Sequence, residues 1–271
     1  TISFKIQNCT LTNAWILSGP YYSGAGIAIY NTKNAYMWNN TLTNNHYGVD
    51  LEISSYAKVF NNNISNNQVG VLFLNVGNAE FGHNFMNNNN MSGIQLADGA
   101  GVWIHNNTAT NNGNVAASPN SGIMLWGGGS INNLIENNYL KGNYAGFSLR
   151  ASGIAGNVYR GNTVMNCTTV WIECTNGATG NTFYHNAFYA GGAKTTGITA
   201  ADKFDNGYPS GGNYWSGYAG VDNNWGPAQN KAGPDGIGDT PFGVQGAVND
   251  NYPWMGPRAG NRVQNLNTSQ W

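Results

Sequence analysis

The sequence has 271 residues and a formal net charge of −1 at pH 7, and only 8% of its residues are charged, against roughly 25% in an average globular domain. Such a composition excludes the basic surface that nucleic-acid binding requires. No apolar run approaches the roughly 20 residues that cross a bilayer, so we expect no membrane span. A hydrophobic share of 41% is enough for a core and excludes a disordered chain.

The chain begins at Thr1 without an initiator methionine, and we expect a processed, secreted protein that works outside the cell or at its surface. Its first residues, Thr1 to Ile6, alternate like a strand with no coil before them. We therefore expect this end to be an open edge, available for pairing with another copy.

A repeat governs the chain from there to about residue 203. A glycine followed by alternating apolar residues recurs every 22 to 24 residues, with one longer step of 29. The leading positions are 26, 48, 70, 93, 122, 146 and 169. The longer step contains residues 112–120, which we interpret as a loop inserted into one coil.

A second column follows the first in the same register. Apolar residues lead into an asparagine at positions 40, 63, 84, 107, 138, 162 and 186. Asparagine suits a bend because it tolerates a left-handed backbone, and stacked amides can form a hydrogen-bonded ladder. Alternation indicates strands, and about 22 residues accommodate three short strands with their turns. The sequence therefore predicts an all-β fold, a right-handed parallel β-helix over residues 1–203.

The repeat ends after Asn186, and residues 204–257 form a Gly-, Trp- and Asp-rich segment that we predict to be an irregular C-terminal cap. It contains GNYWSGY from Gly212, DGIGDTPF from Asp235 and DNYPWM from Asp250. In this order the motifs resemble the NosD-like family of periplasmic and archaeal surface β-helix proteins. The resemblance implies an extracellular module, and it does not carry over that family's association with copper sites. Residues 258–271 are predicted to be an extended tail.

The DGIGD segment also resembles a degenerate calcium loop, because carboxylates spaced around glycines can surround a hard cation with oxygen ligands. The candidate ligands are Asp222, Asp235 and Asp239. The alternative is an Asp/Gly turn that caps the last coil without a metal.

If the residues that directly follow each leading position alternate in and out, one outer face carries a line of apolar side chains. This predicted ridge consists of Leu72, Leu74, Met124, Trp126 and Trp171. It is a candidate surface for a sugar chain or a second subunit. The alternative is that the 112–120 loop or the C-terminal segment covers it.

The same face carries few charges. Asp50 and Glu52 share one coil, while Arg150 and Glu173 lie on neighbouring coils and can pair. Several coils separate the two groups, by roughly 20 Å at the usual strand spacing. A lyase or epimerase needs its acid and base to converge, so we expect no catalytic cluster here.

Histidines, cysteines and glycosylation sequons complete the candidates. His83 and His185 occupy one column on distant coils and His105 is offset by one residue, so we expect polar turn residues and no metal site. Cys167 and Cys174 are candidates for a disulfide, with buried free thiols as the alternative. Candidate glycosylation sites are Asn8, Asn39, Asn63, Asn90, Asn106, Asn166 and Asn267.

Three functions remain open at this level. The first is a secreted or cell-surface structural protein that associates with copies of itself, in a head-to-tail filament if the contact does not close. The second is a carbohydrate-binding module that uses the predicted ridge. The third is a polysaccharide lyase or epimerase, and it ranks last.

Overall fold

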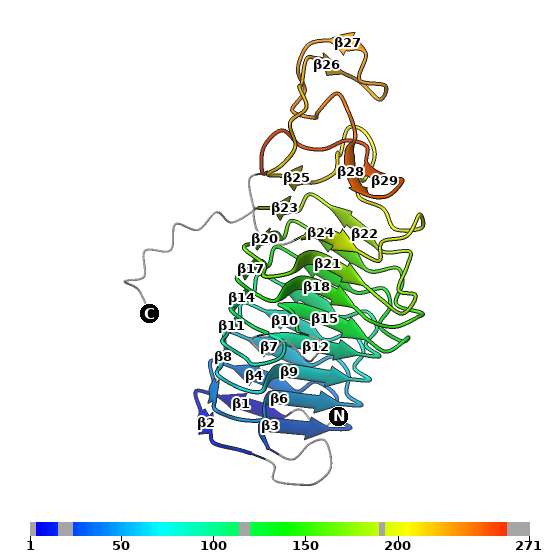
Figure 1. Ribbon diagram of the computed structural model, residues 1–271. Coiled ribbons are helices and arrows are strands. Elements are labelled where there is room, and N and C mark those ends of the chain that lie inside the picture. The colour runs from blue at the N-terminus through cyan, green and yellow to red at the C-terminus, as the bar shows by residue number, and fades with distance from the viewer. Residues whose placement is uncertain (1–3, 16–23, 114–119, 190–192, 259–271) are drawn as a thin grey trace, which may run out of the picture.

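The computed structural model describes residues 4–15, 24–113, 120–189 and 193–258, and it shows a solenoid of parallel strands (Figure 1). Three sheets run along the solenoid, and each coil contributes one strand to every sheet. Neighbouring strands pair in parallel with constant register. The predicted all-β parallel β-helix is therefore confirmed.

Sheet A has eight strands and sheet B has nine. The strands of sheet A are β1 (Lys5–Gln7), β4 (Tyr36–Trp38), β7 (Lys58–Phe60), β10 (Glu80–Gly82), β13 (Trp103–His105), β16 (Leu134–Glu136), β19 (Val158–Arg160) and β22 (Thr182–Tyr184). Those of sheet B are β2 (Thr10–Thr12), β5 (Thr41–Thr43), β8 (Asn63–Ser65), β11 (Phe85–Asn87), β14 (Thr108–Thr110), β17 (Tyr139–Lys141), β20 (Thr163–Met165), β23 (Ala187–Phe188) and β25 (Tyr214–Trp215).

Sheet C has eight longer strands, which correspond to the predicted glycine column. They are β3 (Ala25–Tyr30), β6 (Tyr47–Glu52), β9 (Val69–Leu74), β12 (Ile94–Ala97), β15 (Ile123–Trp126), β18 (Ala145–Leu149), β21 (Val170–Cys174) and β24 (Ala193–Thr196). The core lies inside the three sheets and is filled by fully buried aliphatic and aromatic side chains such as Phe73, Phe81 and Phe147.

A buried asparagine ladder runs along the corner between sheets A and B. Its members, Asn40, Asn62, Asn84, Asn107, Asn138, Asn162, Asn186 and Asn213, each donate from Nδ2 to Oδ1 of the next, at 2.9–3.1 Å. The ladder thus takes Asn62 where the sequence column placed Asn63, which is exposed. From Asn40 to Asn186, the left-handed residue is the one before each ladder amide, for example Asn61 with φ 55°. The amide and the bend therefore use different residues, because the buried amide must point inward.

A second ladder joins Asn45, Asn67, Asn89, Asn112 and Asn143 at the corner between sheets B and C. Met165 pairs with Lys141, so Cys167, two residues after Met165, takes the position that Asn143 has in the preceding coil. Cys174 lies in strand β21 of sheet C, beside Leu149. Both thiols are buried and free, so the predicted disulfide is absent. Cys167 occupies a position in the second asparagine ladder, and Cys174 occupies a position in the core.

The cap continues the stacking before it departs from it. Sheet B extends to β25, beyond the predicted boundary at residue 203. The cap then adds two antiparallel hairpins, β26 (Asn224–Trp225) with β27 (Lys231–Ala232), and β28 (Phe242–Gln245) with β29 (Val248–Asp250). Trp215 is buried between Phe188 and Phe242, with ring centroids 4.5 and 4.7 Å away.

Asp250 ends the asparagine ladder. Its Oδ2 accepts from the Asn213 backbone N–H at 2.7 Å and from Trp215 Nε1 at 2.8 Å. Burial raises the pKa of Asp250 to about 7, although these hydrogen bonds oppose the shift. No helix in the described part of the chain is long and apolar enough to cross a membrane.

Candidate functional site

The outer face of sheet A carries the richest set of side chains. Each strand of this sheet is three residues long, so its middle residue points into the core and the two flanking residues point outward. The inward row includes Met37, Phe81 and Ile104, all fully buried. The register stacks the outward residues of successive coils in two straight rows.

Aromatic rings occupy much of both rows. Trp38 and Trp103 are 44% and 39% exposed, whereas Tyr36, Phe60 and Tyr184 are half-buried. We call this surface the sheet A face, and it comprises Tyr36, Trp38, Lys58, Phe60, Glu80, Trp103, His105, Glu136, Arg160 and Tyr184. It therefore exposes flat apolar area on strands β4, β7, β13 and β22.

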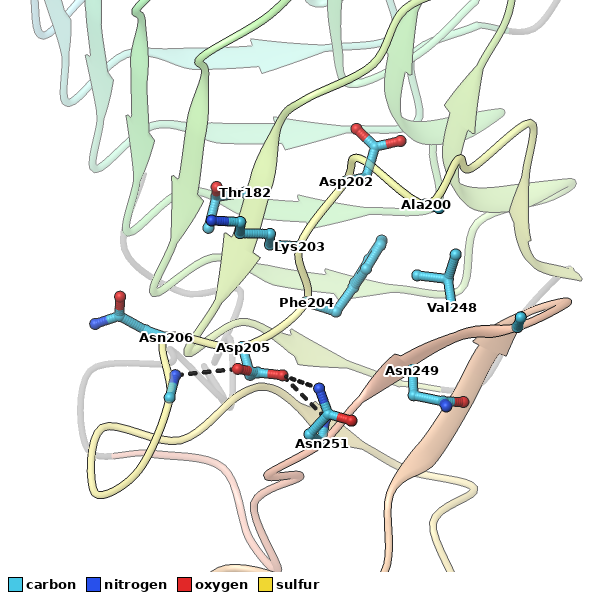
Figure 2. Close-up of a pocket in the computed structure, with 12 residues that line it drawn as sticks. Thr182, Ala200, Asp202, Lys203, Phe204, Asp205, Asn206, Val248, Asn249 and Asn251 are labelled. Atoms are coloured by element: carbon cyan, nitrogen blue, oxygen red, sulfur yellow. Dashed lines mark hydrogen bonds between the residues drawn. The ribbon is translucent and has the colours of Figure 1, made fainter. Parts of the chain in front are cut away.

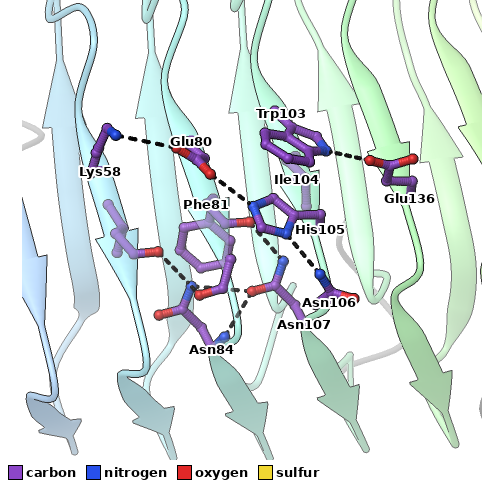
Figure 3. A network of polar contacts seen from close by, with 12 residues as sticks. Lys58, Glu80, Phe81, Asn84, Trp103, Ile104, His105, Asn106, Asn107 and Glu136 are labelled. Atoms are coloured by element: carbon purple, nitrogen blue, oxygen red, sulfur yellow. Dashed lines mark hydrogen bonds and ion pairs between the residues drawn. The ribbon is translucent and has the colours of Figure 1, made fainter.

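His105 lies at the centre of this face (Figure 3). Its ring stacks on Trp103 with centroids 3.9 Å apart, and its edge meets Phe60 at 6.0 Å and His83 at 5.5 Å. Gly82 makes room for the imidazole, because a Cβ at that position would lie 2.6 Å from the ring. A larger residue at Gly82 would thus displace the aromatic cluster.

Two hydrogen bonds fix the tautomer of His105. Its Nε2 lies 3.2 Å from Glu80 Oε1, and its Nδ1 lies 2.9 Å from Asn106 Nδ2. Because the Asn106 Nδ2 nitrogen can only donate, His105 Nδ1 accepts and Nε2–H donates to Glu80. Burial lowers the pKa of His105 despite the neighbouring Glu80, so the ring is neutral at neutral pH.

The charges on the sheet A face are paired with one another. Lys58 Nζ lies 3.6 Å from Glu80, and Arg160 Nε lies 2.7 Å from Glu136. Glu136 also accepts from Trp103 Nε1 at 2.8 Å, which fixes the exposed indole ring. The face is therefore polar, rigid and close to neutral overall.

Sequence reasoning did not find this face. It set aside His83 and His105 as polar turn residues, whereas the structure places their rings in edge-to-face contact on neighbouring coils. The signal was present in the second column, where Trp38 and Trp103 flank an inward residue. Applying the in-out alternation to that column, as well as to the glycine column, would have exposed it.

The predicted ridge on sheet C does not form an exposed surface. Leu72 and Met124 are 4% and 2% exposed, Leu74 is half-buried, and only Trp126 is exposed. Trp171 lies opposite Gly146, where the predicted register placed residue 169, so the prediction was two residues out. The Trp171 ring is buried against Phe188 and Trp215. The ridge is thus wrong as a ligand surface.

The predicted ion pair on sheet C is present, although Glu173 is opposite Ser148 in the register and not opposite Arg150. Arg150 Nη2 pairs with Glu173 Oε2 at 2.6 Å, as expected. Asp50 lies on β6, with β9, β12, β15 and β18 between it and β21. Asp50 is fully buried, and among the described residues its two carboxylate oxygens find no hydrogen-bond partner. Burial, together with Glu52, raises its pKa to about 7.

The three candidate calcium ligands accept hydrogen bonds within the cap. Asp222 accepts from the backbone N–H of Asp235 and Gly236, at 3.0 and 2.7 Å. Asp239 accepts from Asn223 and Asn224. In the ranges that the structure describes, no three His, Cys, Asp or Glu side chains are grouped to hold a metal. Calcium binding by these residues stays a prediction.

The glycosylation candidates fall into three groups. Asn8, Asn39, Asn63, Asn90 and Asn166 are exposed, Asn106 is half-buried, and Asn267 lies outside the described residues. Asn39 Nδ2 donates to Asn8 Oδ1 at 2.8 Å, so these two sequons are stacked on adjacent coils. Their occupancy remains a prediction.

Solved structures and one family model are similar to this chain. No match was found among curated proteins. Among solved structures, the chain resembles pectate lyase Pel9A, with a TM-score of 0.45, 17% identity, and coverage of 65% of this chain and 52% of that one. It also resembles the catalytic domain of a GH87 α-1,3-glucanase in complex with tetrasaccharides, with a TM-score of 0.39, 13% identity, and coverage of 74% and 56%.

The chain spans only about half the length of these two proteins. Residues 25–188, more than half of the chain, match the family model described as the right-handed β-helix region. With the three parallel sheets, this match shows that the chain belongs to the right-handed β-helix family.

Proposed function

We propose that this protein is an extracellular β-helix that binds a neutral polysaccharide along the sheet A face. The observation that supports it most is the set of exposed and half-exposed aromatic rings on strands β4, β7, β13 and β22 of one face, with Trp38 and Trp103 the most exposed. Exposed apolar area rimmed by polar groups marks ligand-binding surfaces. Flat aromatic rings suit the C–H faces of sugar rings, which contact π-systems through weak hydrogen bonds.

The charge pattern supports a neutral ligand. Lys58 with Glu80, and Arg160 with Glu136, form pairs that leave little net charge on the face. A polyanion would need unpaired cations to attract it. Hydroxyl groups of a neutral sugar, in contrast, find both donors and acceptors at these pairs.

Rigidity also favours binding of an extended chain. Trp103 is held by Glu136 and by stacking on His105, so its ring loses little freedom when a ligand arrives. Pre-organised contact groups reduce the entropic cost of association. The rings of β4, β7 and β13 are also distributed along the solenoid axis, so that one extended chain can contact several of them.

Trp103→Ala tests the proposal by affinity electrophoresis in gels that contain a neutral glucan, mannan, xylan or galactan. We expect retardation of the unaltered protein by at least one polymer and its loss in the variant. Trp126→Ala is the matched control, because Trp126 is 41% exposed on sheet C and belongs to the ridge that the structure rejects. Retardation that Trp126→Ala abolishes and Trp103→Ala leaves intact would contradict the proposal.

Self-association is the second candidate function. Strands β1, β2 and β3 are the terminal strands of sheets A, B and C, so within the described ranges their outer edges have no strand partner. Open edges invite pairing with another chain. Light scattering after gel filtration should show dimers or longer assemblies of a cell-surface structural protein, and a monomer at every concentration would contradict it.

The finer family assignment is also part of this proposal. The three cap motifs support membership of the NosD-like branch of surface β-helix proteins, and the five exposed sequons are consistent with a glycosylated, secreted chain.

A further inference from the structure

A cavity of about 610 Å³ lies where the last coil meets the cap hairpin. Thr182 and Lys203 line it from the coil side, and Val248 and Asn249 line it from the hairpin β28–β29. Figure 2 shows Lys203 and Asn249 on either side of Phe204 and Asp205. The cavity therefore lies at the junction between the β-helix and the cap.

The cavity continues the sheet A face. Thr182 is the last member of the outward row that contains Lys58, Glu80 and Trp103, and it bridges to Lys203. Asp205, two residues further on, continues the other outward row. A linear ligand that follows the sheet A face towards the cap would thus reach this cavity, and the hairpin β28–β29 would stop it there.

Some polar side chains of the lining form hydrogen bonds within the protein, and others do not. Asp205 accepts from the backbone N–H and the side chain of Asn251, at 3.0 and 2.9 Å, and so ties the coil to the hairpin. Lys203 and Asn249 are exposed, and their side chains make no hydrogen bond or ion pair within the described residues. They offer donors and an acceptor to a ligand without breaking existing bonds.

The composition fits one neutral sugar residue better than an anion. Among the described residues of the lining, Lys203 is the only cation and Asp205 is a nearby carboxylate. The Asp202 carboxylate is already bonded to the backbone N–H groups of Asn181 and Thr199. An anionic group would meet the Asp205 carboxylate beside Lys203, whereas hydroxyl groups can pair with amine, amide and carboxylate alike. Val248 and the alanines of the lining provide apolar contact for the ring carbons.

We propose that this cavity binds the terminal residue of the neutral polysaccharide that lies on the sheet A face, so that the protein recognises chain ends. This inference rests on the proposed function. It adds a directional element that the row of aromatic rings lacks, because the face alone would bind any internal stretch of a polymer.

The test uses the full chain and oligosaccharides prepared from the polymer that retards it most. Isothermal titration calorimetry compares three forms of one oligosaccharide: unmodified, blocked at the reducing end, and blocked at the non-reducing end. We expect one block to weaken binding at least about tenfold, and the other to have little effect. In Lys203→Ala and Asn249→Ala, the unmodified oligosaccharide should bind as weakly as the blocked one.

The controls separate this proposal from the one on which it rests. Lys33→Ala removes an exposed lysine outside the sheet A face and should change nothing. Equal binding of all three forms, unaffected by Lys203→Ala but lost in Trp103→Ala, would overturn the terminal site and leave the polysaccharide function standing. Failure of every neutral polymer to bind the unaltered protein would overturn both.

Discussion

The asparagine ladder gives the sharpest stability prediction, and Asn107 is the residue to change. Its side chain takes part in four hydrogen bonds: it accepts from Asn84 N and Nδ2, and donates to Phe81 O and Asn138 Oδ1. At about 1 kcal/mol net each, these bonds amount to roughly 4 kcal/mol. The Asn84 backbone N–H is then left unpaired in the interior, which adds about 1–2 kcal/mol. We expect Asn107→Ala to lower the free energy of unfolding by about 5–6 kcal/mol.

Equilibrium unfolding in urea, followed by circular dichroism and tryptophan fluorescence, measures this loss, provided that the two probes coincide. Asn111→Gly is the control, because Asn111 is an exposed bend residue with φ 53° that glycine adopts without strain. It should change stability by no more than about 0.5 kcal/mol. A cost below about 1 kcal/mol for Asn107→Ala would refute the idea that buried amides hold the coils together.

Three further predictions concern ionisable groups. Asp50 has a folded pKa of about 7, above its ordinary 3.8, so its contribution to stability is full below pH 4 and is lost as the pH rises to 7. The free energy of unfolding of Asp50→Asn should therefore gain about 2–3 kcal/mol over that of the unaltered protein between pH 5 and pH 8. Parallel pH profiles of the two proteins would contradict this. Burial raises the pKa of Cys167 to about 12 and that of Cys174 further; both thiols should resist alkylation at pH 8 until the protein is unfolded, and rapid labelling of the folded chain would show that they are accessible. If Asp222, Asp235 and Asp239 bind calcium, the ion should raise the melting temperature of the unaltered protein and not that of Asp222→Asn, and equal shifts would place the ion elsewhere.

The coils were predictable because their physical cause is repeated in every turn. A glycine packs against the backbone of the next coil, two apolar residues point inward, and an amide closes the corner, so the same letters recur at the same spacing. The error at Asn62 shows the limit of such columns. Three consecutive asparagines, 61 to 63, are indistinguishable as letters, and only burial decides which one joins the ladder.

The register error at Trp171 has a different origin. The column places Trp171 where earlier coils have glycine, so no local pattern marks the residue. Its ring enters the core because Phe188 and Trp215 of later coils offer aromatic contacts there. Trp215 belongs to the non-repeating part of the chain, so the repeat pattern does not predict its position.

The cavity at the cap lies beyond sequence reasoning for the same reason. Asp205 and Asn251 meet across 46 positions, and their contact depends on how the chain returns from the second hairpin. The sheet A face, in contrast, follows from simple alternation once the correct column is chosen. Features of the repeated coils can be predicted from the sequence, whereas the contacts of the cap that closes the β-helix have to be observed in the structure.

A division of roles between the inside and the outside explains why this chain can be so poor in charge. Amide ladders and stacked apolar rows provide the stability of the coils, and they need no ion pair. Each coil then contributes two residues of sheet A that point away from the core, so the core does not dictate their identity. That glutamates, arginine, histidine and tryptophan gather on this one face of a nearly uncharged chain is therefore hard to explain by folding. It follows naturally if the sheet A face is the surface that binds.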